Sequence, residues 1–195
     1  MLALKKIAVT GGLSSGKSTA CHMLKELGAH VVSADEIVHR LLSPKTPIGQ
    51  EVIKLLGGKI VDRGTIDRTQ IAEEVFAHPH KLATLEKLLH PAVLAEIEQE
   101  FEREAAKDGN PLFIAEIPLL YESESEKQFD VVIAIVSEKQ LARERFQNPK
   151  EFEKRMERQI DPHQKAARAD YTLHNNGTLA DLKKQILNLY QQLII

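Results

Sequence analysis

Nine consecutive residues near the start of the chain have the types and spacing of a phosphate-binding loop. The segment 11–19 reads GGLSSGKST and fits the pattern G-x-x-x-x-G-K-[ST] without a gap. In such a loop, glycines let backbone N–H groups approach phosphate oxygens, a lysine adds positive charge and a serine hydroxyl ligates Mg²⁺. The pattern therefore predicts a nucleoside triphosphate site, and a glycine-rich turn that binds nothing is the alternative. The predicted binding residues are Gly11, Gly12, Leu13, Ser14, Ser15, Gly16, Lys17, Ser18 and Thr19.

The residues on either side of this motif favour the same interpretation. A phosphate loop needs a strand before it and a helix after it. The apolar run Ile7–Val9 precedes the motif, and Ala20, Leu24 and Leu27 follow at helical spacing, with Gly28 at the place of a helix C-cap. Because this helix begins inside the motif, the positive end of its dipole faces the bound anion.

Five short β-type runs, separated by helical segments, predict an α/β fold with a five-stranded parallel sheet flanked by helices, as in P-loop NTPases. The runs are Lys6–Thr10, Ala29–Ser33, Leu112–Glu116, Val131–Val136 and Tyr171–His174. The stretch between the second and third runs shows helical periodicity and no convincing strand, and Pro91 should begin a new helix or kink an existing one. We expect a nucleotide-binding core at 1–35, 110–140 and 166–195, and a helical substrate-binding subdomain at 36–109.

Residues 141–165 are rich in both arginine and glutamate. One interpretation is a solvated helix with many ion pairs. The other is a mobile lid that brings arginines to the triphosphate, because a small kinase must exclude water from the γ-phosphate. We favour the lid.

Two carboxylates follow predicted strands, where ligands of parallel sheets bind. Asp35 follows the second strand and can take the proton of an attacking hydroxyl or orient that hydroxyl, although it could also serve as a helix N-cap. Glu116 ends the third strand and can act on Mg²⁺ through water, with a buried salt bridge as the alternative.

The composition of the chain argues against several classes of protein. A net charge of −2 disfavours nucleic-acid binding, and the absence of an apolar run of about 20 residues disfavours a membrane span. The single cysteine, Cys21, excludes an internal disulfide, fits the cytoplasm and should be a small core residue. We expect a monomer or weak homo-oligomer.

Missing motifs narrow the nucleotide chemistry further. The chain has no Asn-Lys-x-Asp motif for guanine, and no run of four apolar residues ends in Asp-Glu. A GTPase switch and a helicase or transporter ATPase are therefore disfavoured, and a small-molecule kinase is the natural interpretation.

Several motifs together resemble the dephospho-coenzyme A kinase family across nearly the whole chain. The phosphate loop is generic, but the later motifs are specific as a set. The matching segments are Thr10–Ser18, Ser33–Asp35, Gly64 with Asp67-Arg68, Leu89–Pro91, Ile117–Glu122, Arg155-Met156 with Gln159, and Ala169-Asp170 with Asn175–Gly177.

The resemblance implies a reaction in which ATP, with Mg²⁺, phosphorylates the ribose 3′-hydroxyl of dephospho-coenzyme A. It implies that Arg143 and Arg155 contact the triphosphate from the lid and that Asn175 meets the adenine edge. It also implies acceptor-side roles for five residues, namely Arg68, His90, Pro118, Leu119 and Glu122. Three of these have structural alternatives: Arg68 as a surface ion pair with Glu73 or Glu74, His90 at a helix boundary, and Glu122 at a helix N-terminus.

The chain departs from the family pattern in three places. Ser33 replaces the first carboxylate of D-A-D, which leaves Asp35 alone there. Ser14 replaces a glycine and should be tolerated if its φ is not positive. The lid sequence after Arg143 is altered, so which arginine reaches the γ-phosphate stays open. A nucleoside or nucleotide kinase, and an ATP sensor without turnover, are the competing hypotheses.

Overall fold

The computed structural model describes residues 4–107, 109, 111–146 and 148–195. The chain divides into two compact units, one formed by Met1–Ser33 with Phe101–Ile195 and the other by Ala34–Glu100. The subdomain boundary expected at residues 109 and 110 falls partly outside the described residues.

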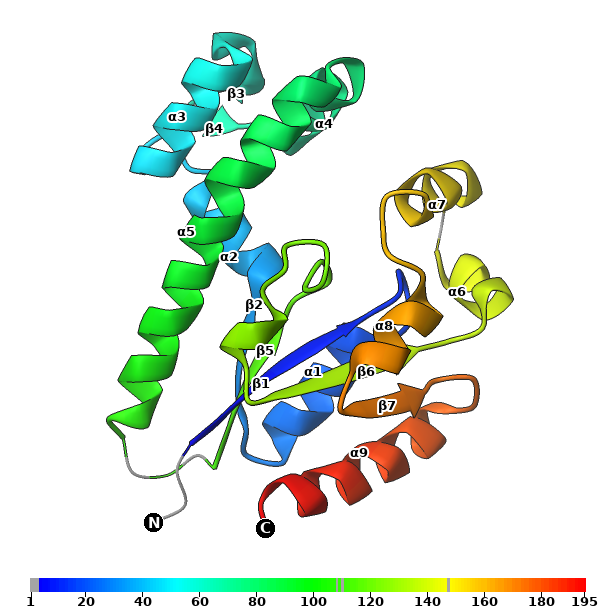
Figure 1. Cartoon of the computed structure of the whole chain (residues 1–195). Helices are drawn as coiled ribbons and strands as arrows, with labels where there is room; N and C mark the ends of the chain where they lie inside the picture. Colours follow the sequence, from blue (N-terminus) through cyan, green and yellow to red (C-terminus); the bar gives the residue numbers. More distant parts are fainter. Residues whose placement is uncertain (1–3, 108, 110, 147) are drawn as a thin grey trace. The chain divides into compact units, whose positions relative to one another are not determined.

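The first unit is built on a five-stranded parallel sheet (Figure 1), which confirms the predicted fold class. The strand order is β2-β5-β1-β6-β7, so β1 lies at the centre. The predicted strands agree with the observed ones to within one residue at each end. The observed strands are β1 (Lys5–Gly11), β2 (His30–Ser33), β5 (Leu112–Glu116), β6 (Val131–Val136) and β7 (Tyr171–His174).

Helices cover both faces of this sheet (Figure 1). On one face, α1 (Lys17–Glu26) and α9 (Leu179–Leu193) bury the larger aliphatic residues of the central strands, such as Ile7 and Ile133. Side chains of a strand alternate between the two faces of the sheet, so Ala8 and Ala134 point to the opposite face. On that face, α8 (Pro162–Arg168) packs against β1 and β6. The small side chains allow this helix to approach the sheet closely.

Cys21 lies on the inner side of α1 and is buried, as predicted. Burial raises the pKa of its thiol, which keeps the sulfur protonated. The residue is therefore part of the hydrophobic core.

The segment predicted to be a lid contains α6 (Lys139–Arg145) and α7 (Pro149–Met156) and continues into α8. Asn148 caps α7, because its side-chain oxygen accepts a hydrogen bond from the Glu151 N–H at 3.3 Å. The role of this segment as a lid stays a prediction.

The second unit is mainly helical, as expected, and has its own apolar core. Its elements are α2 (Ala34–Leu41), α3 (Pro47–Leu56), η1 (Gly58–Ile60), β3 (Val61–Asp62), β4 (Thr65–Ile66), α4 (Arg68–Ala77) and most of α5 (Pro79–Ala105). The core residues are Leu42, Val52, Leu56, Ile60, Ile66, Ile71, Val75 and Leu85. Contrary to the sequence prediction, the unit contains a small antiparallel hairpin, β3–β4. Arg63 and Gly64 form its turn with φ values of 46° and 80°, the left-handed geometry that closes a two-residue hairpin.

Helix α5 runs without interruption through Pro91, so the alternative of a separate helix beginning there is wrong. Proline removes one backbone hydrogen bond and costs about 3 kcal/mol in a helix interior. Buried residues on both sides of it, including Leu85, Val93 and Ile97, hold the two halves on one apolar face. Their burial offsets the cost of the proline.

Glu74 is a buried carboxylate in the second unit that pairs with two lysines reaching it from the surface. Its carboxylate pairs with Lys59 and Lys81. Hydrogen bonds from Lys59 and then from Lys81 lower the pKa of Glu74 to about 2. The carboxylate is thus charged over the whole neutral range.

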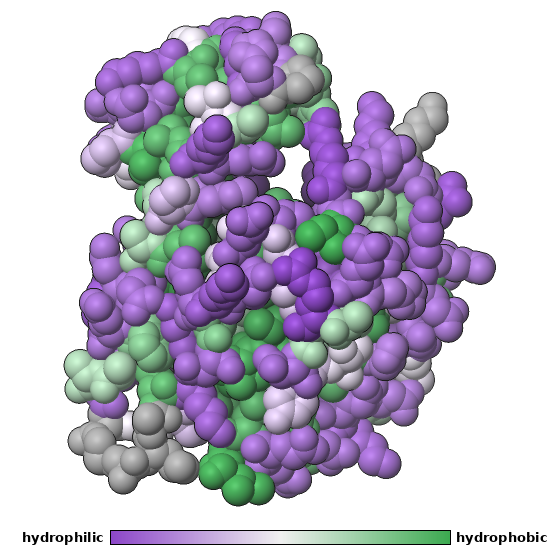
Figure 2. Space-filling view, in the orientation of Figure 1, coloured by the Kyte–Doolittle hydropathy of each residue, from purple (hydrophilic) through white to green (hydrophobic). Residues whose placement is uncertain are grey.

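The visible face of the molecule is mostly hydrophilic, with apolar residues in smaller patches (Figure 2). None of the helices in the described part of the chain combines the length and the apolarity that crossing a bilayer requires.

Candidate active site

The predicted phosphate loop connects the end of β1 to the start of α1. Two of its glycines are required by the backbone. At Gly11 (φ 143°) an added Cβ would lie 1.9 Å from the carbonyl oxygen of Ile135, and at Gly16 (φ 97°) it would lie 2.3 Å from Asn175 Nδ2. The loop therefore fits closely against β6 on one side and the segment after β7 on the other.

Ser14 stands where the family has glycine, and we expected no strain there if its φ was not positive. Its φ is 53°, so the backbone at Ser14 is strained. A non-glycine residue in the left-handed region costs about 1–2 kcal/mol. The loop holds this residue in a conformation that glycine would adopt more easily.

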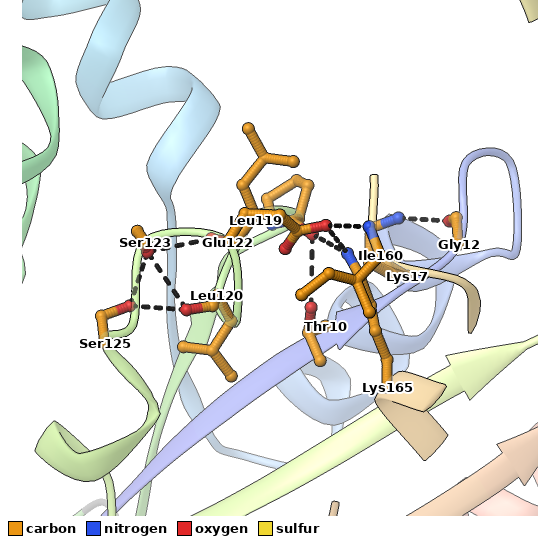
Figure 3. A network of polar contacts seen from close by, with 11 residues as sticks. Thr10, Gly12, Lys17, Leu119, Leu120, Glu122, Ser123, Ser125, Ile160 and Lys165 are labelled. Carbon is orange, nitrogen blue, oxygen red and sulfur yellow. Dashed lines mark hydrogen bonds and ion pairs between the residues drawn. The ribbon is translucent and has the colours of Figure 1, made fainter. Parts of the chain in front are cut away.

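Lys17 lies largely buried at the beginning of α1, and its Nζ donates a hydrogen bond to the Gly12 carbonyl at 2.7 Å (Figure 3). The ammonium group is thereby held over the loop. This places positive charge beside the backbone N–H groups of the helix N-terminus, an arrangement suited to an anion.

Ser18 and Glu116 meet at the carboxyl edge of the sheet. The Ser18 hydroxyl donates to Glu116 Oε1 at 2.7 Å, and the β1–β5 register places Glu116 opposite Val9. Glu116 is only 9% exposed. A hydroxyl and a carboxylate are hard oxygen donors, and Mg²⁺ binds one or two such groups together with phosphate oxygens and water. This pair fits a Mg²⁺ ion, although the described residues contain no cluster of three or more His, Cys, Asp or Glu side chains that could hold a metal by themselves.

A hollow of about 480 Å³ adjoins the phosphate loop. Residues 14–19 of the loop line one side of it, and Arg145, Asn175, Gly177, Leu179 and Leu182 line the rest. Asn175 Nδ2 donates to the Ser15 carbonyl at 2.8 Å, and Arg145 donates to the Asn175 carbonyl at 3.1 Å. These contacts join the lining residues into one wall. The hollow combines anion-binding backbone with apolar and guanidinium surface, which is what a nucleotide requires.

Arg145 was not selected from the sequence. The candidates Arg143 and Arg155 are absent from the described residues that line this hollow. Arg143 is half exposed and lies 4.0 Å from Glu153, while Arg155 pairs with Glu151 one helical turn away. The only sequence signal for Arg145 was its place two residues after Arg143, at the end of α6.

The segment after β5 carries the candidates Pro118, Leu119 and Glu122 in a series of turns. Since Glu122 lies in a turn, the alternative that it opens a helix is wrong. Glu122 Oε1 accepts hydrogen bonds from the Ile160 N–H and from Lys165 Nζ, both at 2.8 Å (Figure 3). No motif or periodicity in the sequence indicates that Lys165 is its partner.

Lys165 is fully buried. Its Nζ also donates to the Pro118 carbonyl at 2.8 Å, and the Thr10 hydroxyl donates to the same carbonyl at 3.3 Å. Burial lowers the pKa of the Lys165 ammonium, while the hydrogen bond to Glu122 acts in the opposite direction.

Three candidates lie in the second unit. Asp35 is exposed in the first turn of α2, which begins at Ala34, so it is not the N-cap that the alternative required. Arg68 is exposed at the first position of α4. Of the two ion-pair partners considered for it, Glu74 pairs with two lysines instead. His90 is half-buried inside α5 and does not mark a helix boundary.

The chain matches known proteins over nearly its full length. The family model described as dephospho-CoA kinase matches residues 5–181. A dephospho-CoA kinase of Protochlamydia amoebophila is 50% identical over 201 residues, covering 100% of this chain and 99% of that protein.

Solved structures agree with this match. A crystal structure from Thermus thermophilus superposes with a TM-score of 0.82 at 28% identity and covers 97% of each chain. A dephospho-CoA kinase from Campylobacter jejuni superposes with a TM-score of 0.71 at 25% identity and covers 95% of each chain. The similarity therefore extends to the fold as a whole.

Proposed function

The chain belongs to the dephospho-CoA kinase family and is an ATP-dependent kinase, and we propose how its residues catalyse the last step of coenzyme A biosynthesis. In the proposed reaction, the γ-phosphate of ATP is transferred to the ribose 3′-hydroxyl of dephospho-coenzyme A. The observation that carries this proposal is the family match over residues 5–181, which contain the phosphate loop and the Ser18–Glu116 pair.

We propose that ATP binds in the hollow beside the phosphate loop. The loop N–H groups and Lys17 would hold the phosphates, and the wall formed by Arg145 and Asn175 would face the nucleoside. The Asn175 amide is bonded to Ser15, so this residue also stabilises the loop. Its contact with the adenine edge stays a prediction.

Ser18 and Glu116 are the residues proposed to hold Mg²⁺, Ser18 directly and Glu116 through water. Their oxygen donor chemistry and their 2.7 Å contact support this assignment. When bound, the ion would supply positive charge to the β- and γ-phosphate oxygens.

Asp35 is the proposed base or hydroxyl-orienting group. The 3′-oxygen of the acceptor would form a bond to the γ-phosphorus while the bond to the β,γ-bridging oxygen breaks, leaving ADP, and the hydroxyl proton would pass to Asp35. Because the transition state is loose, orientation of the hydroxyl matters more than early proton removal. Its exposed carboxylate, two residues after β2, supports the role.

The acceptor-side residues Arg68, His90, Pro118, Leu119 and Glu122 are proposed to bind or position dephospho-coenzyme A. Arg143 and Arg155 are proposed to reach the triphosphate when the lid closes. Their ion pairs with Glu153 and Glu151 are exposed and therefore weak, so these pairs can exchange for phosphate at little cost.

The proposed partners are small molecules only, namely ATP and dephospho-coenzyme A, and the proposed location is the cytoplasm. The lone, buried cysteine and the absence of a basic charge excess support these two proposals. The oligomeric state proposed is a monomer or a weak homo-oligomer.

Acceptor selectivity tests the proposal. The protein is incubated with ATP, Mg²⁺ and either dephospho-coenzyme A or a nucleoside monophosphate, and products are identified by mass. We expect coenzyme A from the first acceptor and little product from the second. Turnover of the monophosphate without coenzyme A formation would contradict the proposed acceptor.

A further inference from the structure

A buried lysine joins two segments of the first unit that are far apart in the sequence. Lys165 on α8 is fully buried, and its Nζ contacts Glu122 Oε1 and the Pro118 carbonyl, each at 2.8 Å (Figure 3). Burying an ammonium group is costly unless it is paired and hydrogen-bonded. A buried ion pair adds little net stability compared with an apolar pair of the same volume, but its hydrogen bonds have fixed directions. This pair therefore acts mainly on geometry.

The contacts of Lys165 extend to three parts of the candidate site. The Pro118 carbonyl also accepts from Thr10, the residue that leads into the phosphate loop. Glu122 also accepts from the Ile160 N–H, between α7 and α8. The network thus links the entry to the phosphate loop, the segment after β5 and the end of the predicted lid.

Helix α8 touches the phosphate loop at its other end. A Cβ added to Gly12 would lie 2.9 Å from Pro162 Cγ, so the first turn of α8 packs directly on the loop. At its last residue, Arg168 bonds Glu126 at 2.6 Å and lies 4.0 Å from the centre of the Tyr121 ring. One short helix therefore sets the spacing between the phosphate loop and the segment 118–126.

Glu122 depends on Lys165 for its orientation. Its second oxygen, Oε2, is buried and has no hydrogen-bond partner within the described residues. Without Lys165, the carboxylate would keep only the bond from the Ile160 N–H and would be a partly buried charge without its present counter-ion. The Pro118 carbonyl would at the same time lose its shorter hydrogen bond.

We propose that Lys165 is a positioning residue for phosphoryl transfer. Through Glu122 and the Pro118 carbonyl it holds the acceptor-side segment in register with the phosphate loop, and it anchors the end of the lid. It does not touch substrate, because it has no exposed surface. This inference rests on the proposed function, and it predicts an effect on kcat rather than on ATP affinity, since misplacing reacting groups by about 1 Å can cost about 100-fold in rate.

Four variants test the inference: K165M, E122Q, K165M/E122Q and, as a control, K127M at an exposed lysine of the same connection. For each, kcat, the KM for dephospho-coenzyme A, the Kd of ATP and the thermal unfolding midpoint are measured. K165M leaves the partly buried Glu122 carboxylate without its ion pair and is expected to be less stable. K165M/E122Q removes that charge, so it is expected to regain stability and remains informative even if K165M fails to fold.

We expect kcat of K165M/E122Q to fall about 10- to 100-fold below that of E122Q, with the Kd of ATP within about 3-fold, because the Pro118 carbonyl still lacks the shorter of its two hydrogen bonds. K127M should match the wild type. A double variant with the kcat of E122Q would show that Lys165 is merely structural, and an equal loss of ATP affinity would place it on the donor side; either result overturns the inference. An inactive wild type would instead contradict the proposed function itself.

Discussion

The fit of the phosphate loop against Asn175 gives a prediction with a matched control. Gly16 and Gly28 flank the two ends of α1 with nearly equal φ values, 97° and 100°. Replacing either by alanine places a non-glycine residue in the left-handed region, at a cost of about 1–2 kcal/mol. At Gly28 the new methyl group would meet only Tyr190 Oη at 3.7 Å, an ordinary contact, whereas at Gly16 it would lie 2.3 Å from Asn175 Nδ2.

The difference between the two sites sets the expected magnitude. Relieving the contact at Gly16 requires a movement of about 1 Å, which breaks the 2.8 Å bond from Asn175 to the Ser15 carbonyl. Losing that hydrogen bond adds about 1 kcal/mol, so Gly16→Ala should lose about 2–3 kcal/mol of unfolding free energy and Gly28→Ala about 1–2 kcal/mol. A displaced loop also loses at least one N–H contact to phosphate, worth about 1.5 kcal/mol or more, which is about tenfold in ATP affinity.

Urea unfolding and calorimetric titration with ATP measure the two quantities. The expected result is an ATP affinity reduced at least about tenfold in Gly16→Ala and unchanged within about 2-fold in Gly28→Ala. Equal ATP affinities in the two variants would refute the reasoning, because the close approach at Gly16 would then have no consequence for the binding site.

Four further predictions concern other parts of the molecule. Asp35→Asn should lower kcat about 100-fold or more in steady-state assays, with ATP affinity nearly intact, and an equal loss of ATP affinity would indicate a metal-binding or structural role instead. Ser18→Ala removes the hydroxyl that contacts Glu116 and should raise the Mg²⁺ concentration for half-maximal activity about tenfold; an unchanged Mg²⁺ titration would argue against this site. Ser14→Gly should raise the unfolding free energy by about 0.5–1 kcal/mol, because relief at φ 53° exceeds the entropy cost of glycine, and a lower value would contradict the strained backbone. The pKa of Glu74 in the folded state is lowered from 4.5 to about 2, so its pairing stabilises the fold above about pH 4.5 and this stabilisation is lost as the pH falls towards 2. The free energy of unfolding of Glu74→Gln should therefore depend less on pH between about 2 and 4.5, and an unchanged dependence would count against this pairing.

The parts of the fold that could be predicted are those encoded in short stretches of sequence, namely the strands of the large sheet and the start of α1. The strands around Ile7 and Ile133 are buried on both faces and read as apolar runs, and the loop motif determines where α1 begins. The hairpin β3–β4 was missed because each strand has only two residues, too few to show alternation. The sequence left open whether a new helix begins at Pro91 or one helix continues through it, because local propensity opposes continuation and packing on both sides of the proline favours it.

The candidate site was predictable where chemistry is local and not where it depends on distant side chains. Ser18 and Glu116 could each be assigned to Mg²⁺ in advance, Ser18 from the loop motif and Glu116 from its place at the carboxyl end of a strand. The contact between Lys165 and Glu122 spans 43 positions in the chain and has no periodic signature. Arg145 likewise lines the hollow because its guanidinium, at the end of α6, donates a hydrogen bond to the Asn175 carbonyl, a contact between residues 30 positions apart.

The stoichiometry of the reaction tests the central claim most directly. With wild-type protein, ATP, Mg²⁺ and dephospho-coenzyme A, phosphorus NMR can follow ADP and the new ribose phosphate in the same sample. The account predicts one 3′-phosphate formed for each ADP released and negligible ADP when the acceptor is omitted. ADP that accumulates without any new sugar phosphate would contradict it, because the triphosphate would then be hydrolysed or sensed rather than used to phosphorylate the acceptor.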